Sequence, residues 1–130
     1  SKSDIVLLDA PCTGTGTFRK NPDVLWIKNI KDIKVNANYQ KNLIIQALNF
    51  LKKDGILIYS NCSLQYEEGE EIIKELSNQK LIYIDKISDK EISGYPKEII
   101  NKGLIRTLPY RYNDEINGLD GFFIARLVKI

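Results

Sequence analysis

Two cysteines, Cys12 and Cys62, are the residues in this chain best suited to covalent chemistry. Each follows a short apolar run that is typical of a buried strand, and neither lies within that run. The chain contains no histidine, which excludes Ser-His-Asp and Cys-His catalysis and every metal site built on histidine. We expect Cys62 to lie just before a helix N-terminus, where the helix dipole favours a thiolate without histidine. The alternative is that both cysteines are small buried hydrophobes.

A glycine-containing segment, Gly14-Thr15-Gly16, follows the first cysteine. It lacks the Gly-Lys-Ser/Thr ending of a phosphate-binding P-loop, and it lacks the third glycine of a dinucleotide-binding fingerprint. On its own, the segment predicts only a flexible loop.

The elements that must position the cysteines alternate between strand and helix. Residues 5–10 predict a parallel strand buried on both faces, and residues 36–53 predict a helix that ends with two lysines in its last turn. The other expected elements are a Glu-rich helix over 66–77, a mostly irregular segment over 85–103, and strands over 56–59, 81–84, 104–108 and 121–128. This order predicts an α/β fold.

Both cysteines come directly after predicted parallel strands. The carboxyl ends of parallel strands meet at one edge of a sheet, and ligands of α/β proteins bind at that edge. The two cysteines, 50 residues apart in sequence, are therefore expected to open onto a common site.

Composition limits the class of protein. The 130 residues are 43% hydrophobic and 28% charged, which indicates one folded domain and excludes a disordered chain. No run approaches the roughly 18 apolar residues of a membrane span. Two cysteines are too few for a zinc finger or a disulfide framework, so we expect free thiols, no metal and a cytoplasmic location.

Charge is unevenly distributed along the chain. Residues 18–42 carry six basic against two acidic residues, and residues 66–100 carry nine acidic residues against five lysines. The basic segment, which adjoins the first cysteine loop, could contact a phosphate backbone. A solvated lysine-rich face explains the same pattern.

Three motifs resemble those of the RNA cytosine-5 methyltransferases of the Sun/RsmB/Nop type. Residues 9–16 read Asp-Ala-Pro-Cys-Thr-Gly-Thr-Gly, which resembles the family's motif IV, Asp-Ala-Pro-Cys-Ser-Gly-Thr-Gly. Residues 59–63 read Tyr-Ser-Asn-Cys-Ser and, with the acidic residues 67–71, resemble motif VI. Arg106, Pro109 and Asp-Gly-Phe-Phe-Ile-Ala at 120–125 resemble the closing motif.

The resemblance implies a Rossmann-like class I methyltransferase fold that uses S-adenosylmethionine. Residues 1–130 would form the C-terminal portion of the catalytic domain. The implied reaction methylates C5 of cytosine in RNA, with ribosomal RNA as the expected substrate, through a covalent bond between a cysteine and C6. By position, Cys62 would be the nucleophile and Cys12 would assist its release. Asp9 would hydrogen-bond the cytosine ring beside the cofactor, and Pro11 would shape the wall between base and methyl donor.

The chain also departs from the family pattern. Asn61 stands in place of the usual Thr before the nucleophile, and Thr13 in place of Ser. The family's Ala-x-Pro-Gly-Gly-Lys cofactor loop, its ribose-binding acid and its N-terminal RNA-binding region have no counterpart in these residues. Three hypotheses follow: the C-terminal part of a longer methyltransferase, an inactive remnant of a split or decaying gene, or a module completed by a separately made N-terminal half.

Overall fold

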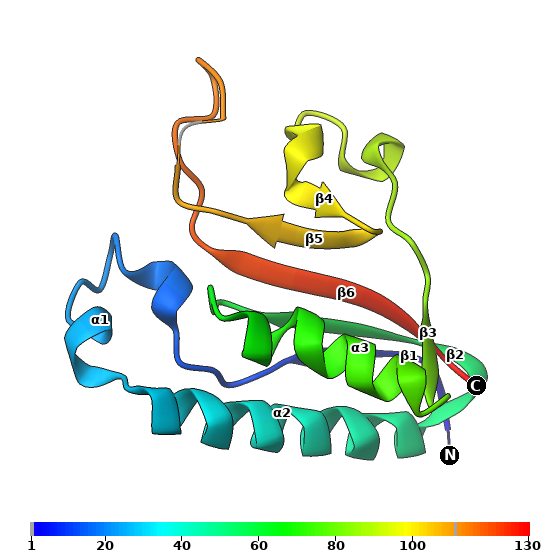
Figure 1. Ribbon diagram of the computed structural model, residues 1–130. Coiled ribbons are helices and arrows are strands. Elements are labelled where there is room, and N and C mark those ends of the chain that lie inside the picture. Colours follow the sequence, from blue (N-terminus) through cyan, green and yellow to red (C-terminus); the bar gives the residue numbers. More distant parts are fainter. Residues whose placement is uncertain (1, 111) are drawn as a thin grey trace.

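A mixed six-stranded sheet organises the chain in the computed structural model, which describes residues 2–110 and 112–130 (Figure 1). The strand order is β1-β2-β6-β5-β4, and β3 also pairs with β6. The β1–β2 pair is parallel and the other pairs are antiparallel. The strands are β1 (Ser3–Asp9), β2 (Leu51–Asn61), β3 (Ile82–Ile84), β4 (Ile100–Asn101), β5 (Leu104–Thr107) and β6 (Phe122–Lys129).

Helices connect these strands. The α-helices are α1 (Val24–Ile27), α2 (Ile30–Phe50) and α3 (Glu70–Asn78), and the 3-10 helices are η1 (Thr15–Thr17), η2 (Tyr66–Glu68), η3 (Asp89–Ile92) and η4 (Lys97–Ile99). The predicted α/β fold is confirmed, and five of the six strands lie where the apolar runs predict them. The segment 85–103, expected to be mostly irregular, also contributes η3, η4 and the short strand β4. In the described part of the chain, no helix is long and apolar enough to cross a lipid bilayer.

Helix α2 begins and ends earlier than the predicted helix over 36–53. Its start is fixed by a capping box, in which Asn29 Oδ1 accepts from Asp32 N at 3.2 Å and Asp32 Oδ2 accepts from Asn29 N at 2.9 Å. Its end comes at Phe50, because Leu51 is extended and already pairs with β1. The two lysines at 52–53 therefore lie in the irregular start of β2, and their prediction as last-turn helix residues is wrong.

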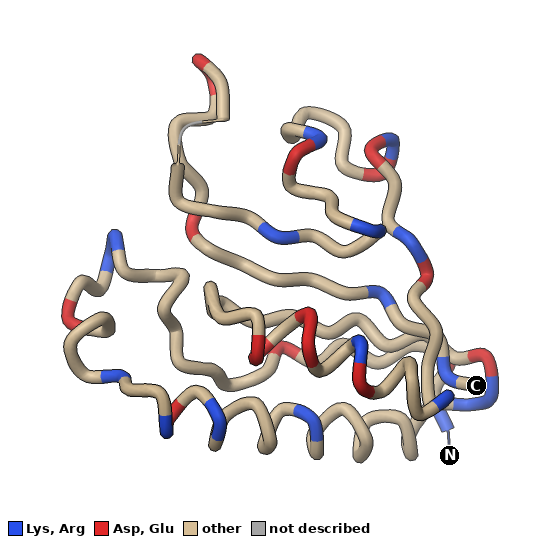
Figure 2. The backbone as a smooth tube through the Cα atoms, in the orientation of Figure 1, with Lys and Arg blue, Asp and Glu red and all other residues tan. Residues whose placement is uncertain are grey.

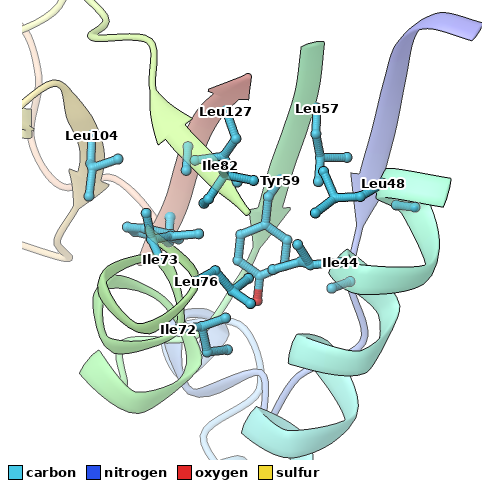
Figure 3. Close-up of a cluster of buried hydrophobic side chains, with 14 of the residues drawn as sticks. Ile44, Leu48, Leu57, Tyr59, Ile72, Ile73, Leu76, Ile82, Leu104 and Leu127 are labelled. Carbon is cyan, nitrogen blue, oxygen red and sulfur yellow. The ribbon is translucent and has the colours of Figure 1, made fainter. Parts of the chain in front are cut away.

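The core lies between one face of the sheet and the helices α2 and α3 (Figure 3). Alternate residues of β2 and β6 point into it, and each of them has no exposed surface: Leu57, Tyr59, Phe123, Ala125 and Leu127. The helices supply Ile44, Leu48, Ile72, Ile73 and Leu76, and the inner face predicted for the Glu-rich helix is confirmed. Burying one such large side chain stabilises the fold by about 2 kcal/mol, so this layer holds β2 rigidly beside the helices.

Strand β1 is not buried on both faces, as the sequence predicted. Val6 and Leu8 pack against the core, whereas the side chains of Ile5 and Leu7 are 62% and 71% exposed on the other face. Within the described residues β1 hydrogen-bonds to one strand, β2, and so forms an edge of the sheet. The continuous apolar run predicted burial of both faces of β1, and the structure buries only the face that carries Val6 and Leu8.

The charged segments lie on neighbouring helices, as Figure 2 shows. Basic residues lie in the loop before α1, in the link between α1 and α2 and along α2, and acidic residues crowd the start of α3. Lys41 Nζ lies 3.0 Å from Glu75 Oε1, so part of the basic segment is neutralised within the fold.

Candidate active site

The two cysteines meet at the carboxyl edge of the parallel strand pair. Strands β1 and β2 run in register, with Asp9 opposite Ser60, so the loops that leave them emerge side by side. The sulfur atoms of Cys12 and Cys62 lie 3.4 Å apart, and both side chains are partly buried. The expected convergence of the two loops is confirmed.

The environment of Cys12 favours its protonated thiol. Burial first, and then the charge and hydrogen bond of Cys62, raise the pKa of Cys12 to about 12. Cys12 therefore keeps its proton and can donate it to the Cys62 sulfur, while its own sulfur accepts from Gly14 N at 3.3 Å.

Alkylation can test whether the pKa of Cys12 is raised and whether Cys62 contributes to the rise. The rate at which iodoacetamide modifies Cys12 is expected to keep rising from about pH 9 to about pH 11, where an ordinary thiol is already ionised. In Cys62→Ala the pKa of Cys12 should fall, because two of the three causes that raise it are removed and burial is the one left. Peptide mass spectrometry measures the rate at each site. If the alkylation rate of Cys12 has the same pH profile in both proteins, Cys62 does not raise the pKa of Cys12.

The helix N-terminus expected just after Cys62 is absent from that position. Three residues separate Cys62 from the short η2, and α3 begins only at Glu70. The helix dipole therefore does not act on Cys62 as the sequence suggested. Instead, the Cys62 carbonyl accepts a hydrogen bond from Gly16 N at 2.8 Å, so the loop after β1 holds the backbone of the loop after β2.

Gly16 is a site of close backbone approach, which corrects the prediction of a merely flexible loop. Gly16 O accepts from Gly121 N at 2.8 Å, and the motif that leads into β6 is thereby joined to both cysteine loops. A Cβ atom added to Gly16 would lie 1.9 Å from Gly121 O and 2.7 Å from Cys62 O. Only glycine fits such a contact. Sequence reasoning missed this role, although both glycines belong to the recognised motifs.

Asn61, which departs from the family motif, is part of a buried hydrogen-bond network. Its Nδ2 donates to Tyr59 Oη at 3.0 Å and to Glu68 O at 2.7 Å, while its Oδ1 accepts from Ser63 N at 3.0 Å. Burial raises the pKa of the Tyr59 phenol, and that hydroxyl donates to Glu68 O at 2.8 Å. Asn61 therefore fixes the backbone on the C-terminal side of Cys62 rather than loosening it.

Arg106 supports the same loop from β5. Its guanidinium forms a two-pronged ion pair with Glu70, with Nε 3.0 Å from Oε1 and Nη2 2.7 Å from Oε2. It also donates to Ser63 O and lies over the Phe123 ring, 4.8 Å from the centroid. A role for Arg106 was not predicted, although its place in the closing motif was the available signal.

Asp9 and Pro11 lie at the exit of β1, and both are exposed. Asp9 Oδ1 accepts from Ser60 Oγ at 3.1 Å, and Pro11 O accepts from Gln40 Nε2 at 2.8 Å. The predicted roles of these two residues toward cytosine and cofactor stay predictions. Among the described residues, no group of three or more carboxylate or thiol side chains is arranged to hold a metal ion.

Solved structures with the same arrangement define the class of protein. NSun6 from Pyrococcus horikoshii, solved with SFG, aligns at a TM-score of 0.74 and 34% identity over 98% of this chain and 30% of its own. A methyltransferase homologue from Pyrococcus horikoshii aligns at 0.73 and 30% identity over 99% of this chain and 40% of its own. The fold is that of part of an S-adenosylmethionine-dependent methyltransferase.

Sequence comparison defines the family. The profile of the 16S rRNA methyltransferases RsmB/F matches residues 1–128. Ribosomal RNA small subunit methyltransferase F of Vibrio cholerae is 35% identical over 98% of this chain, and methyltransferase B of Photorhabdus laumondii is 33% identical over 97%. The chain therefore belongs to the RsmB/F family, which confirms the resemblance seen in the motifs. It spans 26% of the length of each of these two relatives.

Proposed function

We propose that this chain supplies the catalytic cysteines of an enzyme that transfers a methyl group from S-adenosylmethionine to C5 of a cytosine in 16S rRNA. One observation carries the proposal: the sulfurs of Cys12 and Cys62 lie 3.4 Å apart where the two parallel strands end. A cytosine ring placed at that edge would reach both sulfurs from one side.

The proposed reaction is covalent catalysis by Cys62. The Cys62 thiolate bonds to C6 of the cytosine, and the electron pair of the C5–C6 double bond becomes available at C5, which takes the methyl group. Loss of the C5 proton then restores the double bond and expels Cys62 as a thiolate. Cys12, whose sulfur adjoins that of Cys62, assists this release. The target base must leave any stack to reach the pair.

The residues at the exit of β1 fit one part of the cofactor. When bound, S-adenosylmethionine supplies an electrophilic methyl group on a sulfonium. Asp9 offers a carboxylate and Pro11 an exposed ring at the strand end where such a group would lie beside the base. The relative NSun6 was solved with SFG, an analogue of S-adenosylmethionine, which supports this cofactor for the family. The glycine-rich loop and the ribose acid are not among these residues.

We further propose that residues 1–130 are the C-terminal portion of the catalytic domain and that a preceding segment completes the cofactor and RNA sites. The exposed apolar side chains of Ile5 and Leu7 on an edge strand support this, because apolar surface at an open edge favours a covering partner. The 26% share of the relatives supports it as well. An inactive remnant and a module completed by a separate chain are the competing proposals.

Calorimetry with S-adenosylmethionine distinguishes these proposals. The 130 residues alone are expected to show no measurable binding, because Asp9 and Pro11 would contact only one side of the cofactor and the glycine-rich loop and ribose acid are not among these residues. The extended protein, defined as these residues joined to the segment that precedes them in the gene, is expected to bind and to methylate 16S rRNA.

Three other outcomes would each contradict part of this proposal. Micromolar binding by the 130 residues alone would show that the cofactor site is built differently. Activity restored only by a separately produced N-terminal chain would favour the completed module. Binding without any methyl transfer to 16S rRNA would favour the inactive remnant.

A further inference from the structure

Glu68 is a buried acid between the two cysteine loops. It ends the short helix η2, its side chain has no exposed surface, and no step of the proposed reaction uses it. A buried carboxyl group costs several kcal/mol unless hydrogen bonds compensate it, and an apolar residue in its place is often as stable or more stable. The burial of an acid here therefore calls for a reason beyond packing.

The partners of the Glu68 carboxylate come from both loops. Oε1 accepts from Thr13 N at 2.9 Å and from Gln40 Nε2 at 2.9 Å. Oε2 accepts from Thr13 Oγ1 at 2.5 Å and from Ser63 Oγ. Thr13 directly follows Cys12, and Ser63 directly follows Cys62. One side chain thus binds the residue next to each reactive sulfur.

Three further hydrogen bonds connect Glu68 and its partner Gln40 to the surrounding structure. Gln40, which is fully buried on α2, also donates to Pro11 O at 2.8 Å, immediately before Cys12. The Glu68 main-chain oxygen accepts from Tyr59 Oη and from Asn61 Nδ2, both on β2. The loops are therefore held relative to α2 and β2, and not only relative to each other.

We propose that Glu68 is a positioning residue that sets the distance between Cys12 and Cys62. Without it, the donors of Thr13 and Ser63 would lose a common acceptor. The Gly16 N to Cys62 O bond would still join the two loops, but the link between the residues next to the two sulfurs would be lost. Geometry alone supports the effect on spacing, while its consequence for methylation rests on the proposed function. A misplacement of about 1 Å in reacting groups can cost a hundredfold in rate.

Thiol–disulfide exchange with glutathione measures the cysteine spacing without any RNA or cofactor. Cys12 and Cys62 lose two electrons and two protons as one oxidised glutathione becomes two reduced glutathiones, and the ratio of disulfide to dithiol reports how closely the sulfurs are held. In the extended protein, Glu68→Ala is expected to lower this ratio at least about tenfold. Glu68→Gln should retain most of it, because its amide can donate to the Thr13 and Ser63 hydroxyls while its oxygen accepts from Thr13 N.

Leu76→Ala is the matched control. Leu76 is fully buried on α3 within the core cluster, so its loss destabilises the fold by about 2–5 kcal/mol without touching either cysteine loop. Its disulfide ratio should stay at the wild-type value. If Glu68→Ala does not fold, Ser63→Ala decides. It removes the Ser63 hydroxyl, with its contacts to Glu68, Thr13, Thr15 and Gln65 N, but keeps the Glu68 contacts to Thr13 and Gln40, so it should lower the ratio by a smaller factor.

Activity supplies the second readout. Because Glu68 has no exposed surface, Glu68→Ala should lower kcat for 16S rRNA methylation at least about tenfold and leave KM for the RNA unchanged. A wild-type disulfide ratio in Glu68→Ala, or an equal loss in Leu76→Ala, would overturn the positioning role. An extended protein with no methyl transfer at all would contradict the proposed function instead, since the disulfide ratio would still report on Glu68.

Discussion

Cys62→Ala in the extended protein is expected to abolish methylation of 16S rRNA, with a loss of at least about a thousandfold. The reason is chemical: without the thiolate, no bond forms to C6, and C5 of cytosine stays too weak a nucleophile to take the methyl group. The same variant should form no covalent complex with RNA. Methyl incorporation and a denaturing gel of the protein–RNA mixture measure both effects.

Cys12→Ala is the matched variant, because it removes the other sulfur of the same pair. It should also lose turnover, but it should accumulate the covalent complex, since Cys62 still adds to the base while its release fails. Exchanged phenotypes would assign the nucleophile to Cys12. The absence of a complex in both variants would contradict covalent catalysis by this pair.

Gly16→Ala is expected to destabilise the fold by about 3 kcal/mol, which lowers Tm by roughly 10 °C. The new methyl group would lie 1.9 Å from Gly121 O and 2.7 Å from Cys62 O. Both obstacles are backbone atoms, so three chain segments must shift together. Thermal unfolding measures the loss of stability. The methylation rate should also fall at temperatures where the variant is still folded, because Cys62 moves with its carbonyl.

Gly94→Ala is the control for losing a glycine without a clash. Gly94 has a φ of +91°, and a Cβ atom there would meet nothing within 4 Å. Its substitution should cost about 1 kcal/mol, from backbone strain alone. Equal losses in Gly16→Ala and Gly94→Ala would show that the close approach of the three segments is unimportant.

The sequence predicted the meeting of the cysteines because the prediction needed only strand direction. Two apolar runs, each followed by a cysteine, imply that both loops leave one sheet edge when the strands are parallel. The two loops are joined by the Gly16 N to Cys62 O hydrogen bond, and the sulfurs lie 3.4 Å apart. The recognised motifs named the residues, and the register of β1 with β2 explains why residues 50 positions apart lie together.

Features that depend on three-dimensional contacts could not be read from residue order. The capping box at Asn29 starts α2 well before its apolar stripe, and a periodicity argument alone overlooks it. Burial of β1 depends on what covers it, which the apolar run at 5–10 does not state. Glu68 stood within an acidic run typical of a solvated helix face, yet it is the buried acceptor for both loops.

The most direct measurement is to locate the covalent bond on the protein. RNA that carries 5-fluorocytidine at the target cytosine should trap the complex after methyl transfer, because fluorine cannot leave C5 as a proton does. Digestion and mass spectrometry of the trapped extended protein are predicted to find the nucleotide on the peptide that contains Cys62. A nucleotide on the Cys12 peptide, or turnover of unmodified RNA with no trapped complex, would contradict Cys62 as the nucleophile.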